Sequence, residues 1–209
     1  MKMLEAIQKA KSDAPERKFA ESVDIFVNFK NLDLNKAENK ISIELMLPNG
    51  RGKGKKICVF CDEEMGLKAK SASKVILKGD MASIGKKDAK KLAQEYDFFV
   101  AQANLMPEIG KRFGQVLAPR GKMPKPLPPG ADPEPIIKNL DKTVSIKNKG
   151  KNMPVLHAPV GTREMPDEQL AQNAEAILNA IAAKLPQKKQ NIKSVFVKTT
   201  MGPTVRVEV

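Results

Sequence analysis

The two ends of this chain share one pattern of apolar residues, and the middle has another. Residues 23–29 and 41–47 alternate apolar with polar side chains, which is the period-two repeat of half-buried β-strands. Residues 192–200 and 204–209 continue in this extended style and predict a C-terminal hairpin. Between about residues 62 and 147, short helical and strand patterns alternate, which is typical of a small parallel sheet. The contrast predicts two domains of different architecture.

The most economical arrangement joins both chain ends in one domain and inserts the middle as a second one. We therefore expect a fold of the α/β and α+β class: a discontinuous α+β domain from residues 1–61 and 155–209, and an inserted Rossmann-like parallel α/β domain from residues 62–154. Residues 57–61 are interpreted as the returning strand of a long hairpin that begins at residues 41–47.

The net charge restricts the partners of this chain. It has 37 Lys and Arg against 24 Asp and Glu, which gives a net charge of +13 and a pI near 9.7. Such a chain binds polyanions favourably, nucleic acid first and an anionic membrane surface second. Aromatic residues make up only 4% of the chain, with no Trp, which argues against a row of stacking platforms for single strands. Structured RNA or duplex backbone fits better, because both are read by shape, hydroxyls and phosphates.

Several other classes of protein find no support in the sequence. No apolar run approaches the roughly 18 residues that span a bilayer, and the N-terminus lacks the features of a signal peptide, so we expect a cytoplasmic protein. Two Cys and one His cannot complete a four-ligand zinc site, and we expect neither metal nor cofactor. The only histidine, His157, has no Ser or Cys neighbour in a recognised nucleophile motif, so no catalytic residue is predicted.

Two alternatives remain open on the residues alone. Cys58 and Cys61 have the spacing of a redox motif, although residues three apart on a strand point to opposite faces, and buried thiols are the simpler interpretation. An α/β enzyme that uses a nucleotide or these thiols is therefore the second hypothesis. A basic nucleoid or membrane-surface protein, which needs only the charge, is the third.

The corner formed by residues 199–203 combines chemistry that suits RNA. Gly202 has no Cβ, so another backbone can approach closely, and the hydroxyl of Thr200 can bind ribose or phosphate. Met201 offers a soft apolar surface. An ordinary hairpin turn is the competing interpretation.

Several segments together resemble the L-one family of large-subunit ribosomal proteins. The resemblance covers essentially the whole chain, is archaeal in type, and departs from the usual pattern at Ala118, where the family commonly has glycine. The segments that carry it, in chain order, are residues 27–34, 47–53, 117–124, 157–161 and 194–203.

The resemblance implies a non-enzymatic protein of the mobile side stalk of the ribosome. Such a protein binds a folded segment of large-subunit ribosomal RNA and assists deacylated tRNA in leaving the exit site. Many members also repress translation of their own mRNA through a similar RNA site. The implied state outside the ribosome is a monomer in the cytoplasm.

The resemblance also implies contact residues, carried over by motif. Most belong to the domain formed by the chain ends, and three belong to a loop of the inserted domain that would make secondary RNA contacts. The first group is Lys18, Phe19, Asp24, His157, Ser194, Thr200, Met201 and Gly202, and the second is Arg120, Lys122 and Lys125.

Overall fold

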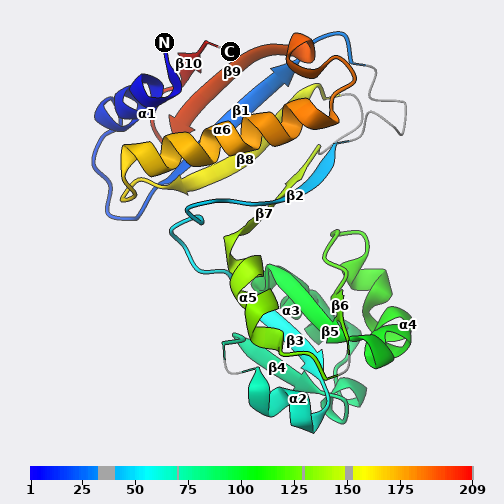
Figure 1. Ribbon diagram of the computed structural model, residues 1–209. Coiled ribbons are helices and arrows are strands. Elements are labelled where there is room, and N and C mark those ends of the chain that lie inside the picture. Colours follow the sequence, from blue (N-terminus) through cyan, green and yellow to red (C-terminus); the bar gives the residue numbers. More distant parts are fainter. Residues whose placement is uncertain (33–40, 70, 129, 149–152, 209) are drawn as a thin grey trace. The chain divides into compact units, whose positions relative to one another are not determined.

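The chain folds into two compact units, each with its own sheet. The computed structural model describes residues 1–32, 41–69, 71–128, 130–148 and 153–208. Unit 1 consists of Met1–Lys53 with Lys142–Val209, and unit 2 is Gly54–Asp141 (Figure 1). Unit 1 contains an antiparallel sheet and unit 2 a parallel one, so the predicted combination of α+β and Rossmann-like α/β architecture is confirmed.

Unit 1 is a four-stranded antiparallel sheet with two helices on one face (Figure 1). The strand order is β10-β9-β1-β8, and β9 pairs with β10 as the predicted C-terminal hairpin. The elements are α1 (Met3–Ser12), β1 (Ser22–Phe29), β8 (Val155–Thr162), α6 (Asp167–Lys184), a 3₁₀ turn at Lys188–Asn191, β9 (Ile192–Thr199) and β10 (Val205–Val207).

Alternating burial along the strands explains why only one face of this sheet carries helices. Val23, Ile25 and Val27 of β1 are fully buried in the core beneath the helices, while the residues between them are half-buried. Helix α6 begins with acidic side chains, which suit the positive end of the helix dipole. It packs closely on β8 at Gly161, where a Cβ would lie 2.6 Å from Cδ2 of Leu170.

A separate two-stranded ladder corrects one prediction. β2 (Ser42–Met46) pairs antiparallel with β7 (Thr143–Lys147), and β3 (Ile57–Cys61) is not its hairpin partner. All five residues of β3 are buried, as expected of an inner parallel strand covered on both faces. The compact units therefore divide after Lys53 and before Lys142, rather than at the expected boundaries near residues 61 and 154.

Unit 2 is a four-stranded parallel sheet in the order β4-β3-β5-β6. Helices cover both of its faces, and the sheet separates two apolar clusters, one on each side. The further elements are α2 (Glu63–Lys68), β4 (Lys74–Leu77), a 3₁₀ turn at Asp80–Ala82, α3 (Lys86–Glu95), β5 (Phe98–Gln102), a 3₁₀ turn at Ala103–Leu105, α4 (Met106–Leu117), β6 (Lys125–Leu127) and α5 (Pro133–Lys142).

The two cysteines occupy the opposite faces of β3. Cys58 belongs to one apolar cluster of unit 2 and Cys61 to the other, so the interpretation as buried strand thiols is confirmed. Burial raises the pKa of Cys58 to about 12 and also raises the pKa of Cys61. Neither thiol is therefore a reactive thiolate at neutral pH, which removes the support for thiol chemistry.

Candidate nucleic-acid interface

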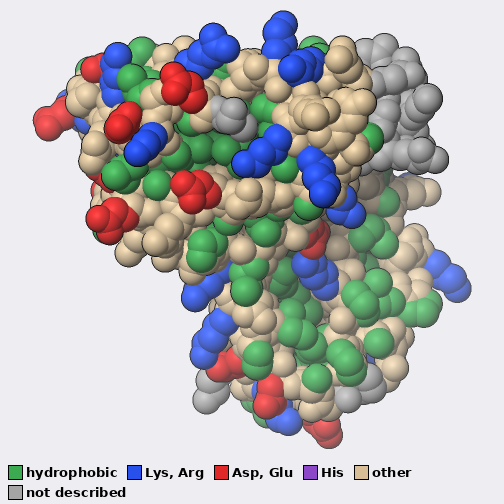
Figure 2. Space-filling model, turned by 45° about the horizontal axis from the view of Figure 1, so that its top comes forward, with side chains coloured by type: hydrophobic (Ala, Val, Ile, Leu, Met, Phe, Trp, Pro, Cys, Tyr) green, Lys and Arg blue, Asp and Glu red, His purple; other side chains and the backbone are tan. Residues whose placement is uncertain are grey.

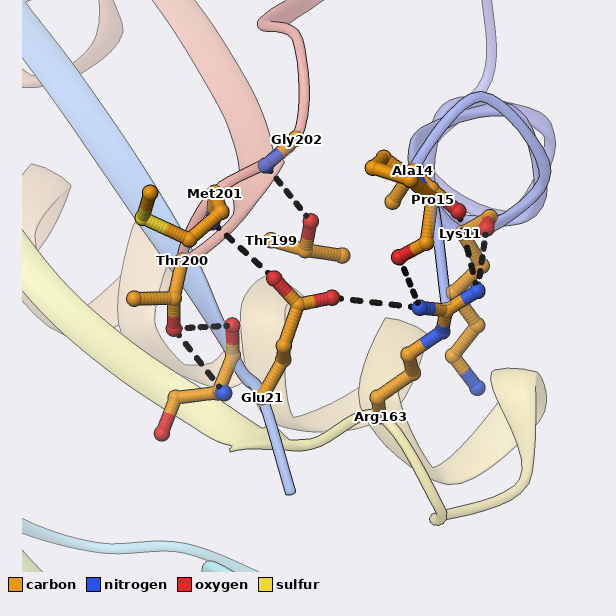
Figure 3. A network of polar contacts seen from close by, with 10 residues as sticks. Lys11, Ala14, Pro15, Glu21, Arg163, Thr199, Thr200, Met201 and Gly202 are labelled. Carbon is orange, nitrogen blue, oxygen red and sulfur yellow. Dashed lines mark hydrogen bonds and ion pairs between the residues drawn. The ribbon is translucent and has the colours of Figure 1, made fainter. Parts of the chain in front are cut away.

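The corner after β9 is tied to the beginning of β1. The Thr200 amide donates to the Ser22 carbonyl at 3.0 Å. The Thr200 hydroxyl accepts from the Ser22 amide at 3.1 Å and donates to the Ser22 carbonyl at 3.3 Å (Figure 3). Because a hydroxyl has one donor and two acceptor sites, Thr200 keeps one acceptor for an outside partner. The hydroxyl that the sequence suggested for RNA thus also holds the corner in place.

A buried carboxylate fixes the next residue of the corner. The Met201 amide donates to Oε1 of Glu21 at 3.1 Å, and the other carboxylate oxygen, Oε2, lies 3.1 Å from Nη1 of Arg163 (Figure 3). Glu21 is only 1% exposed. A buried carboxylate needs a charged partner, and Arg163 supplies it.

The same arginine also forms hydrogen bonds with the end of α1 and with the segment that follows it. Its Nη1 donates to the Pro15 carbonyl, and its Nη2 donates to the carbonyls of Lys11 and Ala14, each at 3.1 Å. Glu21 and Arg163 therefore join three distant parts of the chain beneath the corner. Neither residue was predicted as part of the site, although Glu21 lies only two residues after Phe19.

The protein's own packing accounts for glycine at position 202. The Gly202 amide donates to Oγ1 of Thr199 at 3.1 Å. A Cβ on Gly202 would overlap this same Oγ1 and would lie 3.0 Å from Cβ of Ala14. The sequence-based interpretation reserved the space at this glycine for an RNA backbone. In the structure, Thr199 and Ala14 occupy that space.

Exposed side chains surround the fixed corner. Phe19 is 53% exposed and Met201 is 58% exposed, and Lys18 is also exposed. A shallow hollow of about 470 Å³ is lined by the segment from Glu16 to Glu21 together with Arg163 and Glu164. Phe19 and Met201 thus present apolar surface to solvent close to the polar network of Glu21 and Arg163.

The remaining predicted residues of unit 1 lie on the sheet face opposite the helices. Asp24 pairs with Lys198 across the β1–β9 ladder, and Asn28 pairs with Ser194, so these residues share one face. Asn28 donates from Nδ2 to the Ser194 hydroxyl at 2.9 Å. His157 on β8 is exposed and makes an edge-to-face contact with Phe26, with ring centroids 4.8 Å apart. The structure thus brings Asp24, His157 and Ser194 to one surface.

On this face of the sheet, the Asp24 carboxyl has a raised pKa. Burial raises the pKa of the Asp24 carboxyl, and nearby Arg51, Lys198 and His157 oppose the shift only in part. Holding a carboxylate here at neutral pH opposes folding. A residue kept at such a cost is a candidate for contact with a ligand donor, such as a base amine or a ribose hydroxyl.

We predict that Asp24→Asn stabilises the protein at neutral pH and not in acid. Because folding raises its pKa, Asp24 stabilises the folded state below its unfolded pKa of about 3.9, and this contribution is lost as the pH rises through the folded-state value. The gain of the variant over the wild type should therefore appear as the pH rises from 3 to 7, in the free energy of unfolding measured with urea. Glu164→Gln, at an exposed carboxylate of the same unit, is the control. An equal gain at pH 3 and pH 7 would contradict the prediction.

The predicted secondary contacts in unit 2 have different surroundings. Arg120 is exposed. Lys122 donates from Nζ to the carbonyls of Ala93 and Tyr96 at 3.0 and 2.7 Å, so it caps the carboxyl end of α3. Nζ of Lys125 lies 5.6 Å from the ring centroid of Phe98. Arg120 thus presents its charge freely to solvent, whereas Lys122 stabilises the fold.

Positive charge is distributed over both units. In the view of Figure 2, Lys and Arg side chains are scattered over each unit and are not gathered in one patch. The basic run that ends at Lys151 was predicted to contribute, but residues 149–152 lie outside the described part of the chain. Among the described residues, no group of three or more His, Cys, Asp or Glu could hold a metal ion, and no helix is long and apolar enough to cross a membrane.

The fold and the site define a basic two-unit protein with a preorganised polar and apolar corner on its antiparallel sheet. The model of the ribosomal protein L1p/L10e family matches residues 7–203, and the chain belongs to this family. The predicted membership and its archaeal type are confirmed.

Curated relatives cover nearly the full length. A large ribosomal subunit protein uL1 from Methanothermobacter thermautotrophicus is 50% identical over 209 residues, which are 98% of each chain. Proteins of the same name from Thermococcus kodakarensis and Pyrococcus horikoshii are 47% and 49% identical, over 99% of this chain and 97% and 95% of theirs. Family members are structural proteins of the large ribosomal subunit, in which binding of ribosomal RNA is general, and they are not enzymes.

Proposed function

We propose that unit 1 binds a folded segment of large-subunit ribosomal RNA in the mobile side stalk, with the corner at Thr200, Met201 and Gly202 as its centre. The observation that carries this proposal is the buried Glu21–Arg163 pair, which fixes the Met201 amide beneath an exposed side chain. A corner that is rigid before binding loses little conformational entropy when RNA docks. The net charge of +13 supplies the general attraction, and the corner supplies shape.

The proposal includes two further roles on the ribosome and outside it. The protein assists deacylated tRNA in leaving the exit site, and it represses translation of its own mRNA by binding a site with a similar fold. A rigid recognition surface favours the second role, because it accepts any RNA that presents the same shape. Exposed lysines of α3, together with Arg120, would give unit 2 its contacts with RNA backbone. Outside the ribosome the protein acts as a monomer.

Salt titrations test the proposed RNA recognition. The full chain is titrated with transcripts of large-subunit ribosomal RNA and with random RNA of equal length, from about 50 to 200 mM salt. We expect affinity for both to fall with salt, because lysine–phosphate contacts release counterions. The preference for the ribosomal transcript should persist, since shape contacts release few ions.

Two variants separate the corner from the charge. Thr200→Ala should weaken binding of the ribosomal transcript with an unchanged salt slope, whereas Lys193→Ala, at an exposed lysine of β9, should reduce the slope. Equal affinity for ribosomal and random RNA at every salt concentration would contradict the proposal. So would a larger loss of preference in Lys193→Ala than in Thr200→Ala.

A further inference from the structure

One row of side chains crosses all four strands of the unit 1 sheet on the face opposite the helices. The register aligns Arg206 of β10 with Phe196 of β9, Phe196 with Phe26 of β1, and Phe26 with His157 of β8. Directly paired residues of neighbouring strands point to the same face. With strands about 4.8 Å apart, the row spans about 14 Å.

All four side chains of this row are at least partly exposed to solvent. Arg206 and His157 are exposed at the two ends, and Phe26 and Phe196 are half-buried between them. The His157 ring meets Phe26 edge to face, at an interplanar angle of 77°, which is a favourable arrangement of two aromatic rings. Within the described residues, the Arg206 guanidinium forms no ion pair.

The placement of the aromatic residues matters more than their number. Phe29, Phe60, Phe99 and Phe113 are buried in the cores. Of the four remaining phenylalanines, Phe19, Phe26 and Phe196 lie in unit 1, and two of them form this row. The low aromatic content argued against stacking platforms, but it says nothing about where the few unburied rings gather.

We propose that Arg206, Phe196, Phe26 and His157 form a stacking site for unpaired RNA bases. Partly exposed rings in one row, with a guanidinium at the end of the row, suit the faces of nucleobases, because both rings and guanidinium stack on π-systems. Lys193 and Lys198, on the same strand as Phe196, supply charge for the neighbouring phosphates. The inference rests on the proposed RNA-binding function and adds that part of the bound RNA is single-stranded.

A fluorescent single strand tests the row directly. The probe is a ten-nucleotide oligoadenylate with 2-aminopurine at its centre, titrated at fixed salt against the full-length protein and against Phe26→Leu/Phe196→Leu. Leucine keeps the apolar bulk and removes the ring. We expect the wild type to bind the probe with a change in fluorescence, and the double variant to lose about tenfold in affinity for each ring. Arg206→Ala should also weaken binding and reduce the salt slope by about one.

Matched controls separate stacking from folding and from charge. Phe98→Leu alters a half-buried ring of unit 2 and should leave probe binding unchanged. The wild type and the double variant should bind a blunt RNA duplex with similar affinity, because the bases of a duplex are already stacked on one another. Urea unfolding checks that the double variant is folded.

Two results would overturn the stacking site. In the first, the double variant binds the probe and ribosomal RNA as tightly as the wild type does, while Thr200→Ala weakens binding of ribosomal RNA. The proposed function would then stand without the row. The other is a dimer in sedimentation that only the double variant abolishes, which would assign the row to a second copy of the chain. If ribosomal RNA is not preferred over random RNA, the proposed function fails, and the probe still decides whether the row stacks bases.

Discussion

Replacing Arg163 with alanine is expected to lower the free energy of unfolding by about 3–5 kcal/mol. The substitution leaves the Glu21 carboxylate buried without a cation and removes the donors from the carbonyls of Lys11, Ala14 and Pro15. An uncompensated buried charge is among the most costly changes a fold can undergo, and each unpaired carbonyl adds to it. Urea denaturation at pH 7 measures the loss.

Two further variants test whether the buried, unpaired charge of Glu21 causes the loss of stability in Arg163→Ala. Lys138→Ala removes an exposed partner of Glu134, with the ion pair at 3.6 Å on α5, and should cost less than about 1 kcal/mol. Glu21→Gln combined with Arg163→Met removes both buried charges and keeps similar volumes, so it should be more stable than Arg163→Ala alone. The explanation fails if Arg163→Ala costs no more than Lys138→Ala.

Loss of Arg163 should also weaken recognition of ribosomal RNA in protein that is still folded. Without the guanidinium, the Glu21 carboxylate is free to move toward solvent, and the Met201 amide then loses its acceptor. The salt slope should fall little, because Arg163 is 26% exposed and its charge is already neutralised by Glu21. A change in affinity without a change in slope would distinguish positioning of the corner from simple removal of a phosphate contact.

The strands of unit 1 were predictable because burial on one face leaves a trace in the sequence. Val23, Ile25 and Val27 alternate with half-buried residues, and this repeat determines both the strand and its buried side. The partner of Ile57–Cys61 was not predictable in the same way. A continuous apolar strand carries no alternation, so its sequence gives neither face nor neighbour, and parallel pairing with β4 and β5 depends on the whole sheet.

The candidate site shows the same limit at the level of single residues. Thr200, Met201 and Gly202 were predicted because their residue types and their motif are visible along the chain. Glu21 and Arg163 look like any other charged residues, since a sequence does not distinguish a buried carboxylate from an exposed one. Their pairing spans 142 positions and exists only once β1, β8 and the end of α1 have come together.

Gly202→Val is expected to lower the free energy of unfolding by about 1–3 kcal/mol and to weaken binding of ribosomal RNA. The new side chain would overlap Oγ1 of Thr199 and press on Cβ of Ala14. Thr199 is fully buried, so its hydroxyl cannot turn away without giving up the bond from the residue 202 amide. The corner must therefore shift as a whole, and Met201 shifts with it. Urea denaturation and RNA titration on the same preparation measure both effects.

Substitution of alanine at two glycines should change the free energy of unfolding in opposite directions if packing inside the protein requires glycine at position 202. Gly202→Ala should destabilise, because even a methyl group overlaps Thr199. Gly110→Ala, within α4, places its methyl group where no atom outside the neighbouring helix backbone lies within 4 Å, and should stabilise by about 0.5–1 kcal/mol through helix propensity. If Gly202→Ala instead leaves stability unchanged and weakens only RNA binding, then the space at position 202 is reserved for the RNA, as the sequence first suggested. In that case Thr199 and Ala14 would have to yield to the methyl group, which their complete and near-complete burial opposes.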